Sequence, residues 1–249
     1  MFLNSSENNC FTAENLAQLD LFSHLVSAVI VNELISVRTL LATVQAARHV
    51  TAYRDRETGA HVSRTSYYAR LIAQVLAPKH GLKDEFVEQV FLFSPLHDIG
   101  KIAVPDAILG KRGQLSEKEY AVMKDHTKTG RDLIDVMLND FALNTLGRAE
   151  ILRNIAYHHH EAVDGSGYPE GLAGDAIPLE ARISSVADVF DALTSRRPYK
   201  EAWSNDDAFA MLQRLAGSKL DAECVAALVQ MRSKVEEIQA RFLDTPIAP

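Results

Sequence analysis

The sequence predicts an all-α fold, and two observations carry this prediction. Helix-start signals recur along the chain, while no segment shows the alternation of apolar and polar residues that is typical of half-buried strands. Glycine is concentrated in one stretch, "DGSGYPEGLAGD" at 164–175, which holds four of the twelve glycines in the chain. The prediction is therefore a helical protein with one long glycine-rich loop.

The first fifty residues predict a helical extension. Residues 1 to about 15 are polar, and apolar residues then recur at spacings of four and three, at Ile30, Leu34, Val37, Leu41 and Val44. Such a seam belongs to an amphipathic helix, which can pack on its own domain or pair with a partner in a coiled coil. We expect residues 1–50 to be a regulatory element, a dimerising element or the remnant of a longer chain, and residues 51–249 to form the main domain.

Capping residues assign three helix starts further along the chain. Ser116 and Glu119 form a capping-box pattern at the start of one helix. Ser204 precedes two acidic residues and begins another helix, which Gly217 is expected to end. Asp221 is expected to cap the last helix, which would run to about residue 243.

Composition and charge limit the classes of function. The chain has 249 residues, 47% of them hydrophobic, which is enough for one large domain or for a domain with an appendage. The net charge of −7 argues against binding DNA, RNA or an anionic membrane through broad electrostatic attraction. The chain shows no signal-peptide pattern, no apolar span, and two distant cysteines, Cys10 and Cys224. We therefore expect a cytoplasmic protein in a reducing compartment.

Histidines and carboxylates recur in pairs along the predicted helices. An apolar run at 91–96 predicts a core helix that carries His97, Asp98 and Lys101 into a Gly-Lys-Ile turn. Buried ionisable groups are costly unless they are paired or bound to metal. Similar groups occur at Glu57 with His61, at His126, at His159 with His160, and at Asp188 with Asp191. Imidazole and carboxylate ligands without cysteine suit Fe, Mn, Zn or Ni, so the set predicts a metal centre.

The order of these motifs resembles the HD-GYP family of bacterial cyclic-dinucleotide phosphodiesterases. The series is "ETGAH", "HDIGKIAVPDAIL", "MKDH", "HHEAVDGSGYP" and "VADVFDALTSRRPYK". The resemblance covers about residues 50–215 and leaves residues 1–50 unmatched. It departs at "KRGQL", 111–115, where the family usually has proline after lysine, and at the additional His158. It implies an HD-domain-like helical bundle with a long glycine-rich functional loop, to which the apolar seam adds the predicted N-terminal helical extension.

The resemblance also implies roles for individual residues. His97, Asp98 and Lys101 are expected to be catalytic, with Asp98 bridging metal ions and Lys101 reaching the scissile phosphate. His158 is expected to support a ligand or face solvent. The expected metal ligands are Glu57, His61, His97, Asp98, His126, His159, His160 and Asp188. The expected dinucleotide contacts are Gly167, Tyr168, Asp191, Arg197 and Lys200.

The leading functional prediction is a metal-dependent phosphodiesterase that opens cyclic di-GMP, or a related 3′,5′-cyclic dinucleotide, to a linear dinucleotide or to mononucleotides. Two metal ions can supply a bridging hydroxide and hold phosphate oxygens. Eight candidate ligands suit two or three divalent ions, with Fe or Mn foremost and Ni or Zn as alternatives. Glu57 decides between these counts, because it can bind a further ion or orient His61 through a hydrogen bond.

Two alternative functions remain open from the sequence. One is a catalytically weak receptor that binds the cyclic dinucleotide and signals to a protein partner, although the complete ligand set argues against it. The other is a general nucleotide phosphohydrolase with the same His-Asp core, which "GSGYP" and "SRRPYK" disfavour because a mononucleotide needs no platform for two bases. The expected protein partner is a second copy of the chain, bound through the N-terminal helix.

Overall fold

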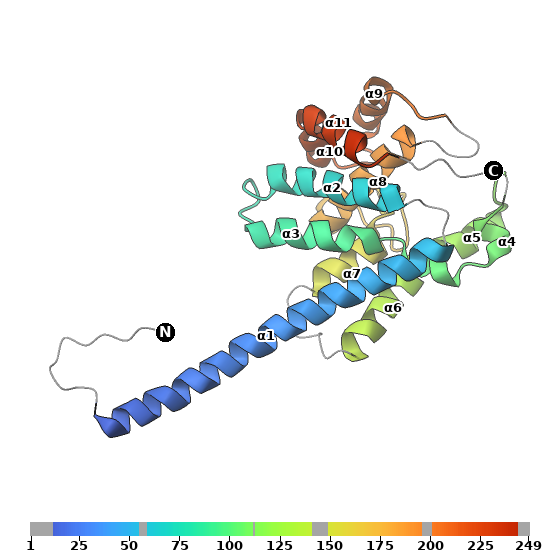
Figure 1. The fold of residues 1–249 in the computed structure, drawn as a ribbon. Helices are drawn as coiled ribbons and strands as arrows, with labels where there is room; N and C mark the ends of the chain where they lie inside the picture. Colours follow the sequence, from blue (N-terminus) through green and yellow to red (C-terminus); the bar gives the residue numbers. More distant parts are fainter. Residues whose placement is uncertain (1–11, 55–58, 112, 141–148, 196–200, 244–249) are drawn as a thin grey trace. The chain divides into compact units, whose positions relative to one another are not determined.

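The structure is a computed structural model that describes residues 12–54, 59–111, 113–140, 149–195 and 201–243. The chain divides into two compact units, Met1–Thr43 and Val44–Pro249. Within the described residues the regular structure is helical, and the extended pairing is limited to two isolated bridges, Asp164 with Ala173 and Ala216 with Leu220 (Figure 1). The predicted all-α class is therefore confirmed.

Helix α1, Ala13–Arg54, begins in the first unit. Ile30 is the member of the expected seam whose side chain the structure describes, and 54% of it is exposed. The other members, Leu34, Val37, Leu41 and Val44, lie outside the described side chains, so the seam stays a prediction. Further exposed apolar side chains on this helix are Leu16, Leu21, Phe22, Leu25, Val29, Val31 and Ile35.

The second unit is a helical bundle built around α2, Gly59–Leu76, which packs against α3, α8 and α10 (Figure 1). Helix α7 packs against α6 and α8, and α6 packs against the short 3-10 helix η2. The remaining bounds are α3 Asp84–Phe93, η1 Ser94–Leu96, η2 Ile99–Ala103, α4 Asp106–Leu109, α5 Glu117–Lys124, α6 His126–Asp140, α7 Ala149–His158, η3 Gly174–Ala176, α8 Leu179–Thr194, α9 Asn205–Leu215, α10 Ala222–Gln230 and α11 Arg232–Arg241. Across the described helices, none combines the length and the apolar character needed to cross a membrane.

The hydrophobic core of this unit packs α2 against α8, the helices that carry His61 and Asp188. The ring of Phe190 on α8 lies 5.2 Å from that of Tyr68 on α2 and 4.8 Å from that of Phe209 on α9, measured between centroids. All three side chains are buried, and each large ring removes apolar surface from water. Helices α2 and α8 are therefore fixed relative to each other by packing.

The capping predictions are confirmed, but the predicted last helix is wrong. Ser116 and Glu119 form the capping box of α5. The side chains of Ser204 and Asp221 accept hydrogen bonds from backbone N–H groups at the starts of α9 and α10. Beyond α10 the helix breaks at Met231, whose φ and ψ are −96° and 22°, and α11 follows as a separate helix. No glycine or proline marks this break, so tertiary packing rather than local sequence decides it.

The apolar run at 91–96 also differs from the predicted continuous helix. Helix α3 ends at Phe93. Pro95 follows two residues later and has no N–H group to continue the helical hydrogen bonds. The Val90 carbonyl accepts hydrogen bonds from both the Ser94 backbone N–H and the Ser94 hydroxyl, the latter at 2.6 Å. His97 and Asp98 therefore lie between two 3-10 helices, η1 and η2, rather than on the face of a long helix.

Candidate metal centre

Segments distant in the sequence bring the predicted ligands together. The helices α2, α6 and α8, the η1–η2 turn and the residues that follow α7 each contribute. The donor atoms form two groups, and those within a group lie within 4.8 Å of one another. The first group is Asp98, His126, His159 and His160, and the second is His61, His97 and Asp188. The remaining predicted ligand, Glu57, lies outside the described residues.

Gly100 lets η2 approach α6 closely enough to form the first group. A Cβ atom at Gly100 would lie 1.9 Å from the His126 carbonyl oxygen and 2.5 Å from the Gly130 nitrogen. Only glycine fits such a backbone contact. The contact places Asp98, two residues before Gly100, beside His126 at the start of α6. No local pattern in the sequence predicted this role, although the glycine directly precedes Lys101.

Hydrogen bonds at Nδ1 fix the orientation of four histidines. In three of them the acceptor is a backbone carbonyl, which can only accept, so the hydrogen lies on Nδ1 and the Nε2 lone pair faces the centre. Metal-binding imidazoles are commonly held this way. The bonds are His97 to Ser94 at 2.7 Å, His126 to Met123 at 2.7 Å, His159 to Ile155 at 3.0 Å, and His61 to the Asp191 carboxylate at 2.7 Å.

Asp98 lies between the two groups. Its Oδ1 is 3.2 Å from His126 Nε2 and 3.7 Å from His159 Nε2, and its Oδ2 is 3.1 Å from His97 Nε2. When two donor atoms bind the same ion, each at about 2.1 Å and with an angle of about 90–120° at the ion, the donor atoms lie about 3.0–3.6 Å from each other. Lone pairs that face one another over such distances repel unless a cation lies between them. The donor set therefore fits divalent metal ions.

Asp188 completes the second group from α8. Its Oδ1 lies 3.7 Å from His61 Nε2 and 3.9 Å from His97 Nε2. Because His97 Nε2 is also close to Asp98, the two groups adjoin through His97 and Asp98. This is the arrangement expected for neighbouring metal ions that share a carboxylate.

The protonation states of the first group suit metal binding. Burial opposes ionisation of Asp98, but Lys101 and His97 outweigh it and hold the pKa of Asp98 well below its usual range. Burial lowers the pKa of His159, and burial together with His159 lowers the pKa of His160. Ionised Asp98 and neutral His159 and His160 are the forms of these side chains that coordinate metals.

Lys101 and Tyr168 border the same centre. The Lys101 ammonium donates to Asp98 Oδ2 at 2.8 Å. The Tyr168 backbone N–H donates to the His160 carbonyl at 3.1 Å, and the centroids of the Tyr168 and His160 rings lie 4.8 Å apart. Burial raises the pKa of the Tyr168 phenol, which stays neutral at pH 7. A cationic and an aromatic side chain therefore flank the predicted metal ligands.

The glycine-rich loop is held by a carboxylate that the sequence analysis did not single out. Glu161 is buried and accepts hydrogen bonds from the backbone N–H groups of Glu170 at 2.7 Å and Leu172 at 2.9 Å. A Cβ atom at Gly167 would lie 2.2 Å from the Ala162 nitrogen. Glycine at 167 therefore lets the loop pack closely on itself, and its expected contact with a dinucleotide stays a prediction.

Asp191 is not placed where a substrate contact was expected. Its side chain is fully buried, and its oxygens accept hydrogen bonds from His61, Arg64 and Ser195. Because these donors surround the carboxylate, Asp191 supports His61 from behind rather than facing the open side of the centre. His158 lies outside both ligand groups, and burial lowers its pKa.

The remaining predicted dinucleotide contacts, Arg197 and Lys200, lie outside the described residues.

A sequence model of the HD domain matches residues 32–224, which is most of the chain. Combined with the helical bundle and the paired His-Asp groups, this match defines the class of protein. The chain belongs to the HD-domain family, within its HD-GYP group.

Curated relatives extend the comparison. A cyclic di-GMP phosphodiesterase response regulator, RpfG of Xanthomonas campestris, is 47% identical over 197 residues, covering 79% of this chain and 49% of the relative. A cyclic di-GMP phosphodiesterase of Thermotoga maritima is 36% identical over 208 residues, covering 82% and 53%. A 3′3′-cGAMP-specific phosphodiesterase 2 of Vibrio cholerae is 36% identical over 191 residues, covering 77% and 34%. The chain thus spans about half the length of these relatives, or less.

One solved structure supports the fold. Bd1817 of Bdellovibrio bacteriovorus, described as an HDG"Y"P protein, matches with a TM-score of 0.51 and 20% identity. The match covers 71% of this chain and 54% of that chain. At this identity the likeness concerns the helical fold alone.

Proposed function

We propose that this chain is a metal-dependent phosphodiesterase that hydrolyses cyclic di-GMP or a related cyclic dinucleotide. The observation that carries the proposal is the pair of adjoining ligand groups, in which Nδ1 hydrogen bonds turn the Nε2 atoms of four histidines toward Asp98 and Asp188. The names of the relatives support the substrate class. An intracellular second messenger as substrate supports a cytoplasmic location.

The residues of the centre have different roles in the proposed cleavage of a phosphodiester. Divalent ions, Fe or Mn foremost, would be held by the seven described ligands and would supply Lewis acidity and positive charge. Lys101 adds a positive charge beside Asp98, where it can stabilise charge that develops on the phosphate. Tyr168 offers an aromatic ring for a base next to His160. Asp98 stays ionised between the two groups.

The direct test is turnover by the metal-loaded chain. We expect protein loaded with Mn²⁺ or Fe²⁺ to convert cyclic di-GMP to linear dinucleotide or mononucleotide. Chromatography measures the products, and 3′3′-cGAMP is tested in parallel as a second substrate. The ratio of the two rates assigns the substrate. Tight binding of either dinucleotide without product would favour the alternative of a receptor that signals to a partner.

The number of metal ions depends on Glu57. We expect Glu57→Ala to lose about one metal ion per chain and much of its activity, because Glu57 lies four residues before His61 and can bind a further ion beside the pair around Asp98. The two-metal core around Asp98 should remain. Elemental analysis checks the stoichiometry, and equal metal content in wild type and variant would show that Glu57 only orients His61.

Substrate affinity should depend on Arg197 and Lys200. Their side chains are charged at neutral pH and do not ligate metals, so replacing both with Ala should weaken dinucleotide binding about tenfold or more while metal content stays constant. Calorimetry with a non-hydrolysed analogue measures the affinity. Wild-type affinity in the double variant would remove this role from both residues.

A homodimer through α1 is a further proposal. The exposed apolar side chains along α1 support it, because a helix with so much apolar surface gains stability when a partner covers it. We expect deletion of residues 1–48 to convert a dimer to a monomer in sedimentation experiments. The same oligomeric state with and without these residues would exclude dimerisation through this helix.

A further inference from the structure

Arg64 lies one helical turn after His61 on α2 and is buried there, with 4% of the residue exposed. Its guanidinium binds the Asp191 carboxylate through two hydrogen bonds. Nε donates to Oδ1 at 2.6 Å, and Nη2 donates to Oδ2 at 3.0 Å. This two-point contact fixes both the position and the plane of the carboxylate, because the planar guanidinium and the carboxylate match each other in geometry.

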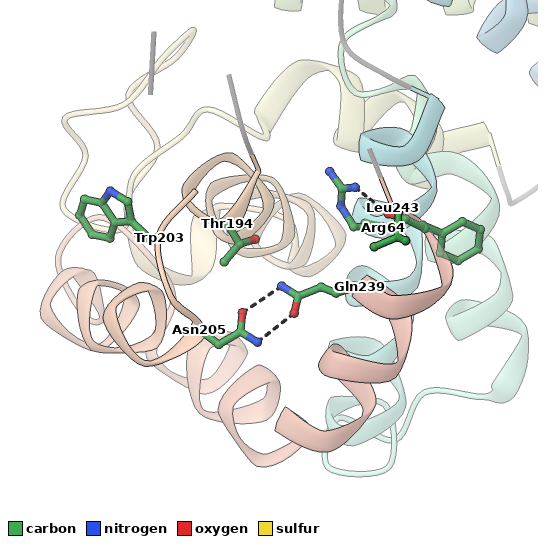
Figure 2. A pocket seen from close by; sticks show the side chains of 7 residues that line it. Arg64, Thr194, Trp203, Asn205, Gln239 and Leu243 are labelled. Carbon is green, nitrogen blue, oxygen red and sulfur yellow. Dashed lines mark hydrogen bonds between the residues drawn. The ribbon is translucent and has the colours of Figure 1, made fainter. Parts of the chain in front are cut away.

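The same guanidinium is held from two further sides. Nη2 also donates to the Ser195 hydroxyl at 2.7 Å, and Nη1 donates to the Phe242 carbonyl at 2.8 Å. The Phe242 ring stacks on Tyr67 with 5.2 Å between centroids. Arg64 also lines a pocket of about 330 Å³ together with Asn205 and Gln239, and Figure 2 shows these side chains. Arg64 therefore connects the ends of α8 and α11 to the helix that carries His61.

His61 is the ligand that receives this support. Its Nδ1 donates to Asp191 Oδ2 at 2.7 Å, which leaves its Nε2 facing Asp188 Oδ1 at 3.7 Å. In His97, His126 and His159 the acceptor for Nδ1 is a backbone carbonyl, and local helical structure fixes each of those carbonyls. A carboxylate on a side chain can rotate, so it orients an imidazole only if something holds the carboxylate.

We propose that Arg64 is a positioning residue for the second metal group. It holds Asp191 so that His61 presents Nε2 toward His97 and Asp188, the residues that would hold an ion with it. The proposal rests on the metal-binding role in the proposed function, and it assigns Arg64 no contact with the substrate. It predicts a defect confined to one metal site, whereas a purely structural role predicts a general loss of stability.

The first test is metal affinity in Arg64→Lys, which keeps the charge and removes the two-point contact. We expect the dissociation constant of one Mn²⁺ site per chain to rise about tenfold or more by calorimetry, since partners of metal-bound imidazoles commonly have effects of this size. The matched control is Arg70→Lys on the same helix, where Arg70 pairs with Glu88 outside the centre. Equal affinities for Arg64→Lys and wild type would overturn the proposal.

The second test reads His61 directly in metal-free protein by nitrogen-15 NMR of the histidine rings. In the wild type we expect His61 to carry its hydrogen on Nδ1, and a hydrogen on Nε2 would overturn the proposal even if no variant folds. In Arg64→Lys we expect His61 to populate both tautomers while His126 and His159 keep theirs. Loss of thermal stability with an unchanged His61 tautomer would assign Arg64 a structural role only.

These measurements separate the two proposals. Neither metal affinity nor the tautomer of His61 depends on turnover. A wild-type chain that binds metal but leaves cyclic dinucleotides intact would contradict the proposed function, and the comparison of Arg64→Lys with Arg70→Lys would still decide the role of Arg64.

Discussion

Asp98→Asn is expected to lower the turnover of a cyclic dinucleotide by about a thousandfold or more and to remove at least one metal ion per chain. Asp98 faces both ligand groups, with Oδ1 near His126 and His159 and Oδ2 near His97 and Lys101. Asparagine keeps the shape but supplies one neutral oxygen in place of two charged ones. The substitution therefore weakens both groups at once.

The measurements for Asp98→Asn are initial rates by chromatography, metal content by elemental analysis, and helical content by circular dichroism. The control is Asp132→Asn, since Asp132 is an exposed carboxylate on α6 that pairs with the neighbouring Arg131. We expect this control to keep full activity, because exposed ion pairs contribute little. Wild-type turnover of Asp98→Asn at reduced metal content would contradict the assignment of the centre.

Gly100→Ala is expected to destabilise the chain by about 3 kcal/mol and to abolish most of the activity. The added Cβ would lie 1.9 Å from the His126 carbonyl oxygen and 2.5 Å from the Gly130 nitrogen, both of which are backbone atoms. A backbone clash cannot be relieved by rotating a side chain, so η2 must move away from α6. That movement separates Asp98 from His126 and His159.

Gly130→Ala tests the same contact from its other side and is expected to be tolerated. A Cβ at Gly130 meets the Gly100 nitrogen at 3.4 Å, Ile99 Cγ2 at 3.5 Å and Ala156 Cβ at 3.7 Å, which are ordinary contact distances. Alanine also favours helix over glycine, so we expect a change in unfolding free energy within about 1 kcal/mol. Urea denaturation of both variants in the presence of chelator measures the difference. Equal stability of the two variants would contradict the proposed close approach of η2 and α6.

The all-α class and the helix caps at Ser116, Ser204 and Asp221 could be predicted because each depends on local signals, whereas the candidate ligand set followed from the resemblance of the ordered motifs to a family. A cap needs one side chain near its own N–H groups. Imidazoles and carboxylates are common metal ligands, and those residue types stand out when they recur in predicted helices. The ordered motifs from His61 to Asp188 are therefore visible in the sequence, while Glu57, Arg197 and Lys200 stay predictions.

The tertiary structure alone decided how those residues are arranged. The break at Met231, the split of the 91–96 run into α3 and η1, and the burial of Asp191 behind His61 depend on packing between segments far apart in the chain. Arg64, Gly100 and Glu161 act through partners up to 178 residues away or through backbone contacts that no spacing reveals. The sequence by itself determined which side chains are available to hold a metal ion, because the donor atoms follow from residue type. The folded chain decided which atoms meet, because distances between segments are set by packing.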